Sequence, residues 1–133
     1  MIVADASITV GWLLNEESAI QTADIYKLIL DSGAIGPAIY PVEVANALRS
    51  ALRRKSIDKA KRDAALSAFA RLVAQDTGLQ PSLAEIVAIS DRHDITPYDA
   101  SYVALAKSRG LVLATTDAAM ARAARAEGLA VLP

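Results

Sequence analysis

Short apolar stretches alternate with longer amphipathic segments along this chain, and this alternation narrows the range of possible folds most. The patterns predict strands at residues 2–4, 111–115 and 129–132, and weaker patterns allow strands at 34–36 and 76–79. Helices are predicted at residues 7–14, 18–31, 41–55, 56–74, 81–92, 96–110 and 117–127. Strands that alternate with helices form parallel sheets with helices on both faces. We therefore expect a three-layer α/β/α fold around a central parallel sheet.

Two of the predicted helices, 41–55 and 56–74, follow each other without a strand between them. Pro41 opens the first, and Ser56 to Asp58 begin the second. We expect this pair to project from the sheet as a helical hairpin. The chain has 133 residues, no internal repeat and no linker-like segment, so a single domain over residues 1–133 is predicted.

The composition restricts the chemistry that the protein can perform. There is no cysteine and one histidine, His93, which excludes thiolate catalysis and metal sites built from several histidines. A metal ion would be held by oxygen ligands, which favours Mg²⁺ or Mn²⁺. Hydrophobic residues make up 53% of the chain, which excludes intrinsic disorder. The apolar start of the chain lacks a basic leader and contains Asp5, so we expect a cytoplasmic protein without a signal peptide or membrane span.

Four acidic residues stand where an open parallel sheet places its ligand site. Asp5 follows the first predicted strand, and Asp117 follows the strand predicted at 111–115. Ligands bind beyond the carboxyl ends of parallel strands. Glu43 and Asp99 lie in the first turns of predicted helices, and such helix starts face the same edge when they follow a strand. The sequence therefore predicts that these four carboxylates gather in one cleft.

Each of these acids also has a purely structural interpretation. Thr96 and Asp99 fit a capping box, and Glu43 near a helix start favours the helix dipole. Asp5 and Asp117 fit ordinary helix N-caps. Spacing alone does not decide between caps and a metal site.

The residues around the acids carry a resemblance to a known family. The segments are IVADASITVGWLLNEE at 2–17, PVEVANALRSALRR at 41–54, and ITPYDASYVALAKSRGLVLATTDAAMARAARAEGLAVLP at 95–133. They resemble, in order and spacing, the blocks of PIN-domain proteins, and in particular the VapC-type toxins of VapBC toxin–antitoxin pairs. The resemblance spans the whole chain.

This resemblance implies a PIN-like sheet of about five parallel strands and Mg²⁺- or Mn²⁺-dependent cleavage of RNA. It implies that four acids bind the metal and that Thr116, which precedes the last of them, takes part in catalysis. The four acids are Asp5, Glu43, Asp99 and Asp117. Ser7 and Asn46 match accessory polar positions. A small antitoxin partner and a homodimer are implied as well, with the helix at 18–31 and the helical hairpin as candidate surfaces.

Other functions remain open at this point. The same metal site would serve a nuclease of RNA processing or of DNA, and a non-catalytic binding module would keep the fold without turnover. A phosphoacceptor receiver domain is disfavoured, because the first strand offers one acid and no lysine follows Thr115 and Thr116. Basic residues between Arg49 and Arg62 either form a solvated helical face or contact phosphates beside the cleft. His93 is expected to lie at a helix end.

Overall fold

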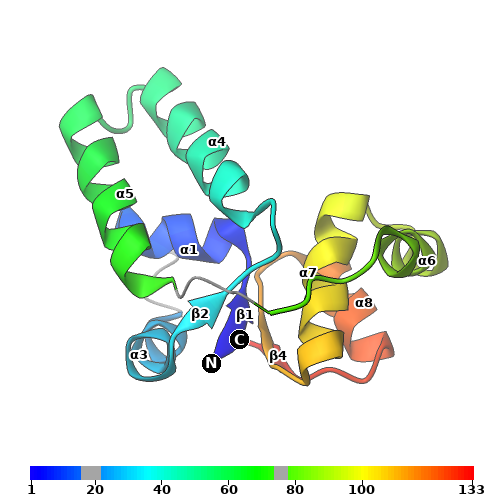
Figure 1. Ribbon diagram of the computed structural model, residues 1–133. Helices are drawn as coiled ribbons and strands as arrows, with labels where there is room; N and C mark the ends of the chain where they lie inside the picture. Colours follow the sequence, from blue (N-terminus) through cyan, green and yellow to red (C-terminus); the bar gives the residue numbers. More distant parts are fainter. Residues whose placement is uncertain (16–21, 74–77) are drawn as a thin grey trace.

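A computed structural model of the protein describes residues 1–15, 22–73 and 78–133 (Figure 1). The described strands are β1 (Ile2–Ala4), β2 (Ala34–Ile35), β3 (Leu113–Ala114) and β4 (Val131–Leu132). The described helices are α1 (Ala6–Leu13), α3 (Ala23–Ser32), α4 (Tyr40–Arg53), α5 (Lys59–Leu72), α6 (Leu83–His93), α7 (Pro97–Arg109) and α8 (Ala118–Ala126). The predicted alternation of strands and helices is confirmed, although residues 18–21 of one expected helix lie outside the described residues.

The strands form a parallel sheet in the order β2-β1-β3-β4. This confirms the α/β class, but the described sheet has four strands rather than about five. Residues 76 and 77 of the expected strand at 76–79 lie outside the described residues. Just before them, Val73 forms an isolated parallel bridge with Ala34.

Alternation along β1 divides the core between the two faces of the sheet. Ile2 and Ala4 belong to a hydrophobic cluster with residues of α1 and α3. Val3 points to the other face and joins a larger cluster to which α4, α6, α7 and α8 contribute. Successive side chains of a strand point to opposite faces, so these three residues fix which helices cover which side. The three-layer arrangement follows.

Helices α4 and α5 project from the sheet as a hairpin, as the sequence predicts (Figure 1). At its base the rings of Tyr40 and Phe69 meet edge to face, with centroids 5.2 Å apart. At its far end Ser56 N donates to Ala51 O at 3.1 Å, and Ile57 is buried. The turn between the helices is therefore packed as well as hydrogen-bonded. None of the described helices is long and apolar enough to cross a membrane.

Candidate active site

A cavity of about 200 Å³ lies where β1 and β3 end. These two strands are neighbours, and Asp5 N donates to Ala114 O at 3.0 Å just beyond β1. Residues of four separate segments line the cavity: Asp5, Ala6, Ser7, Glu43, Asn46, Ala47, Asp99, Tyr102, Asp117 and Met120. The structure therefore brings all four acids to one cavity, together with the accessory candidates Ser7 and Asn46. Their metal-binding role stays a prediction.

Asp5 is the most deeply buried of the four acids, with 3% of its surface exposed. It is the N-cap of α1, and its Oδ1 accepts a 2.7 Å hydrogen bond from Ile8 N. Its Oδ2 accepts a hydrogen bond from the Thr115 hydroxyl. One carboxylate oxygen of Asp5 therefore caps α1, and Thr115, just after β3, holds the other. The structural role and the place in the cavity coexist in one residue.

Glu43, in the first turn of α4, is held from across the cavity. Its Oε2 accepts a hydrogen bond from the hydroxyl of Tyr102 on α7. The Tyr102 ring is 1% exposed and lies edge to face with that of Tyr40, at a centroid distance of 6.0 Å. Burial, and then the bond to Glu43, raise the pKa of Tyr102 far above its usual range. Tyr102 is therefore a neutral hydrogen-bond donor on a rigid support.

Asp99 and Asp117 lie on the more open side of the cavity. Asp117 is the N-cap of α8, and its Oδ1 accepts from Met120 N at 2.7 Å. At the start of α7, Thr96 Oγ1 accepts from Asp99 N at 3.1 Å. Among the described helices, the reciprocal capping box is formed by Ser82 and Glu85 at α6. Asp99 is half-buried and lines the cavity.

The acids influence one another electrostatically. Burial raises the pKa of Asp5, and the charges of Asp117 and Asp99 raise it further against the hydrogen bonds from Ile8 and Thr115. Burial also raises the pKa of Asp99, again with the charge of Asp117. Carboxylates that share a cavity resist full ionisation unless a cation joins them. The cavity is therefore suited to positive charge.

The threonine that contacts Asp5 is Thr115, the residue before the predicted Thr116. Thr115 is 3% exposed, and its Oγ1 donates to Asp5 Oδ2 while accepting from Asp117 N at 3.0 Å. Thr116 is exposed and is not among the residues that line the cavity. A Thr hydroxyl that accepts from the amide two residues later is a common local turn, so the Thr-Thr-Asp sequence carried this signal. No comparable local pattern in the sequence indicated that Tyr102 would bind Glu43.

The side chains of the cavity are of the types that bind a divalent cation, but they are not arranged around a common point. Carboxylates, the amide of Asn46 and the hydroxyl of Ser7 are the oxygen donors that Mg²⁺ and Mn²⁺ prefer. Among the residues that the structure describes, no three acidic or histidine side chains converge as a ready metal cluster. Two of the carboxylates, Asp5 and Glu43, are instead held by hydroxyl groups. The donor set fits the metal, and the convergence of the donors stays a prediction.

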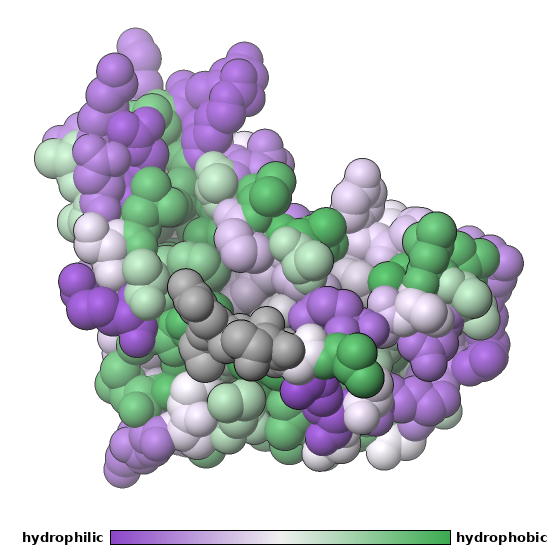
Figure 2. All heavy atoms as spheres, in the orientation of Figure 1, coloured by the Kyte–Doolittle hydropathy of each residue, from purple (hydrophilic) through white to green (hydrophobic). Residues whose placement is uncertain are grey.

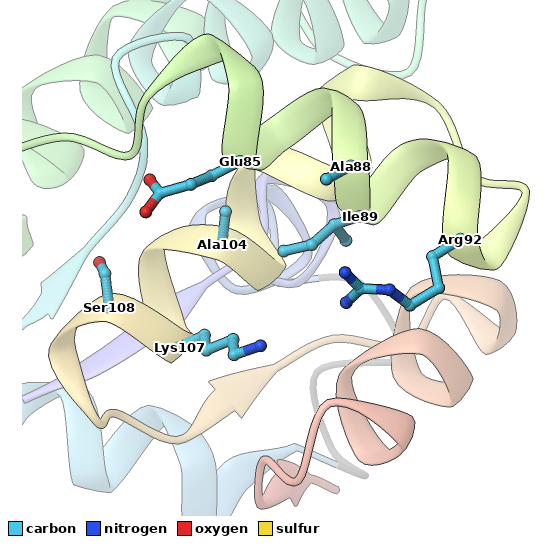
Figure 3. Close-up of a pocket in the computed structure, with 7 residues that line it drawn as sticks. All are labelled: Glu85, Ala88, Ile89, Arg92, Ala104, Lys107 and Ser108. Carbon is cyan, nitrogen blue, oxygen red and sulfur yellow. The ribbon is translucent and has the colours of Figure 1, made fainter.

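A larger hollow of about 360 Å³ lies elsewhere, between α6 and α7 (Figure 3). Arg92 and Lys107 at its edge both bond to the carboxylate of Glu127, whose side chain is 5% exposed. His93, the last residue of α6 as expected, bonds to the same carboxylate at 2.7 Å. Lys107 and His93 lower the pKa of Glu127 to about 2. These three side chains already bind Glu127 and so tie together the ends of α6, α7 and α8. The acidic cavity is therefore the better candidate for catalysis.

Comparison with known proteins agrees with this assignment. The sequence matches the PIN domain family over residues 2–126. Ribonuclease VapC9 of Mycobacterium tuberculosis is 33% identical over 120 residues, which cover 88% of this chain and 86% of VapC9. Ribonuclease VapC1 of the same organism is 34% identical over 122 residues, which cover 91% of this chain and 89% of VapC1.

Solved structures show the same fold. The crystal structure of PAE2754 from Pyrobaculum aerophilum has a TM-score of 0.72 at 23% identity, covering 98% of this chain and 90% of that one. The crystal structure of FitAcB from Neisseria gonorrhoeae has a TM-score of 0.64 at 19% identity, covering 100% and 97%. Together with the acidic cavity at the carboxyl ends of β1 and β3, these matches show that the chain belongs to the PIN-domain family.

Proposed function

We propose that the protein is a Mg²⁺- or Mn²⁺-dependent endoribonuclease and the toxin of a toxin–antitoxin pair. The observation that carries the proposal is the cavity that four acids from separate segments line, at the carboxyl ends of neighbouring parallel strands. The names of the relatives, Ribonuclease VapC9 and Ribonuclease VapC1, support RNA as the substrate.

Two of the four acids are held in place by hydrogen bonds, and the other two lie where a substrate can reach them. Asp5 and Glu43 are oriented by Thr115 and Tyr102, so these carboxylates lose little freedom when a cation binds. Asp99 and Asp117 complete the donor set at the open side, where the scissile phosphate has access. When bound, the metal lowers the pKa of a water molecule and neutralises charge on the phosphate oxygens.

A protein partner and a second copy of the chain belong to the same proposal. VapC-type relatives, and the resemblance of the fold to FitAcB, support a small antitoxin as the partner. Helix α3 exposes three large apolar side chains, those of Tyr26, Leu28 and Leu30. Tyr26 and Leu30, four residues apart, lie on one face of the helix, and exposed apolar side chains that share a face support a buried contact between two proteins. We propose a homodimer through α3, and the mass in solution from light scattering tests it.

The decisive experiment is cleavage of a labelled total-RNA pool by the purified protein with Mg²⁺, Mn²⁺ or EDTA. An Asp5→Asn variant is the control, because asparagine keeps the N-cap of α1 and removes the charge. We expect metal-dependent cutting that the variant loses. Cutting that survives both EDTA and the substitution depends on neither a metal nor Asp5 and contradicts the proposal. Equal cutting of a DNA pool would mean that the substrate is not restricted to RNA. Metal binding without any turnover would indicate a binding module.

A further inference from the structure

Positive charge is concentrated at the far end of the α4–α5 hairpin. Seven of the fourteen Lys and Arg residues of the chain fall between positions 49 and 62, in a protein of net charge −1, and Asp58 is the one acid among them. We call this group the basic tip; its members are Arg49, Arg53, Arg54, Lys55, Lys59, Lys61 and Arg62. Figure 2 shows hydrophilic residues gathered over this end of the hairpin. The rest of the protein is correspondingly acidic.

Most of these cations are available to a partner. Arg62 pairs with Asp63 at 2.9 Å. The other six side chains are exposed, and in the described part of the chain none of them forms an ion pair. The backbone that carries them is well defined by Ser56 and Ile57, so the charges stand on a rigid support.

Several of the cations stand where they oppose the local structure. Lys59 and Lys61 occupy the first turn of α5, where the positive end of the helix dipole disfavours cations, and Asp58, the N-cap, is the one acid beside them. Lys55 has a φ of +57°, a conformation for which glycine or asparagine is usual. A surface that served solubility alone would not need cations at these positions. Their placement favours binding of an anion.

The basic tip is connected to the acidic cavity by α4 itself. Glu43 and Asn46 line the cavity from the first turns of this helix. Arg53 stands ten residues after Glu43, which corresponds to about 15 Å along a helix. That is longer than the screening length of about 10 Å at 0.1 M salt, so Arg53 and the tip cations beyond it do not serve to neutralise the cavity acids. An extended polyanion that reaches the cavity is long enough to contact both.

We propose that the basic tip binds the phosphate backbone of single-stranded RNA at nucleotides away from the cut. The choice of RNA rests on the proposed nuclease function. The acidic cavity repels phosphates, and the tip supplies the opposite charge on the same helix. Contacts of this kind carry no sequence preference and hold the substrate in place.

The test is binding of a fluorescent single-stranded RNA, measured by anisotropy in EDTA so that the RNA stays intact. The variant replaces Arg49, Arg53, Lys59 and Lys61 with Gln. The control makes the same change in net charge elsewhere, at Lys27, Arg71, Arg122 and Arg125, which are also exposed.

The tip variant is expected to bind RNA about a hundredfold more weakly at about 0.1 M salt. Its salt slope should fall by about 3, because each phosphate that the protein no longer neutralises lowers the slope by about 0.7. Its melting temperature should stay near that of the wild type, because the loss of two cations from the start of α5 offsets the loss of Arg53 from the last turn of α4. The control should bind nearly as the wild type does.

Equal losses in both variants, no loss in the tip variant, or no RNA binding by the wild type would each overturn the proposal. A parallel titration with an oligoglutamate peptide identifies the competing partner. If the tip binds this peptide and not RNA, the tip belongs to an acidic protein. Because binding is measured without metal, failure of the nuclease assay leaves this result readable: tip-dependent RNA binding without cutting would overturn the nuclease alone.

Discussion

The hydrogen bond between Tyr102 and Glu43 offers a direct way to separate positioning from packing. Tyr102→Phe keeps the buried ring and removes the hydroxyl that holds the Glu43 carboxylate. A hydrogen bond to a charged group contributes about 1.5–3 kcal/mol, and the lower end applies because Glu43 is partly accessible to water. A loss of about 1.4 kcal/mol in the transition state corresponds to a tenfold slower reaction. We therefore expect roughly tenfold slower RNA cleavage.

Tyr40→Phe is the matched control for this variant. The Tyr40 ring is also 1% exposed, and its hydroxyl lies 2.5 Å from Thr9 Oγ1 rather than from a carboxylate. Thr9 keeps its 2.9 Å bond to Asp5 O, so the control should cost about 1 kcal/mol of stability. The assays are urea unfolding, single-turnover cleavage, and the rise in melting temperature with Mn²⁺.

The outcome turns on the difference between the two tyrosine variants. Both should be less stable than the wild type, whereas Tyr102→Phe alone should cut slowly and gain less from Mn²⁺. If Tyr102→Phe cuts and responds to Mn²⁺ like the wild type, the bond to Glu43 only stabilises the fold. If Tyr40→Phe is equally impaired in cutting, the effect belongs to the core and not to Glu43.

Two further predictions concern buried carboxylates. Asp5→Asn should raise the melting temperature in EDTA at neutral pH, since the raised pKa of Asp5 means that its charge destabilises the folded protein. The gap should close as pH falls through that raised pKa, and a variant that melts below the wild type at neutral pH would refute this. Glu127→Gln should lower the free energy of unfolding at pH 7 by about 1–2 kcal/mol, well below the full shift because Arg92 and Lys107 are half exposed. Because the pKa of Glu127 is lowered to about 2, its contribution to stability is complete above pH 4.5 and disappears as pH falls towards 2. Urea unfolding of both proteins at pH 7 and near pH 2 checks this. A difference in stability between wild type and variant that is unchanged at low pH would contradict it.

Asp63→Asn is the comparison for Glu127→Gln. Its ion pair with Arg62 lies on the surface, with 66% of the Asp63 side chain exposed. Exposed pairs of this kind contribute little, about 0.5 kcal/mol or less. A loss as large as that of Glu127→Gln would mean that the three hydrogen-bond partners of Glu127 are not the source of its effect.

The order of elements was predictable because it is encoded locally. Hydrophobic periodicity and helix-capping signals act within one or two helical turns, and several of the predicted caps are present in the structure. Thr96 accepts from Asp99 N, Gly110 ends α7 at a φ of +62°, and Asp5 and Asp117 cap α1 and α8. The position of acids directly after strands then placed them at one edge of the sheet, because parallel strands share their carboxyl ends.

The partners of those acids were not predictable in the same way. Thr115 and Asp5 are separated by 110 positions, and Tyr102 and Glu43 by 59. No periodicity links residues so far apart. Thr116 matched the family pattern better than Thr115, yet the backbone leaving β3 directs the Thr115 side chain to Asp5.

The sequence by itself therefore determined the element types, the fold class and the four acids that line one cavity. Tertiary structure alone decided which hydroxyl groups hold Asp5 and Glu43, and that Glu127 joins Arg92, His93 and Lys107. The physical reason is range. Local patterns reflect the geometry of single helices and strands, whereas these contacts exist only once distant segments have packed against the same sheet.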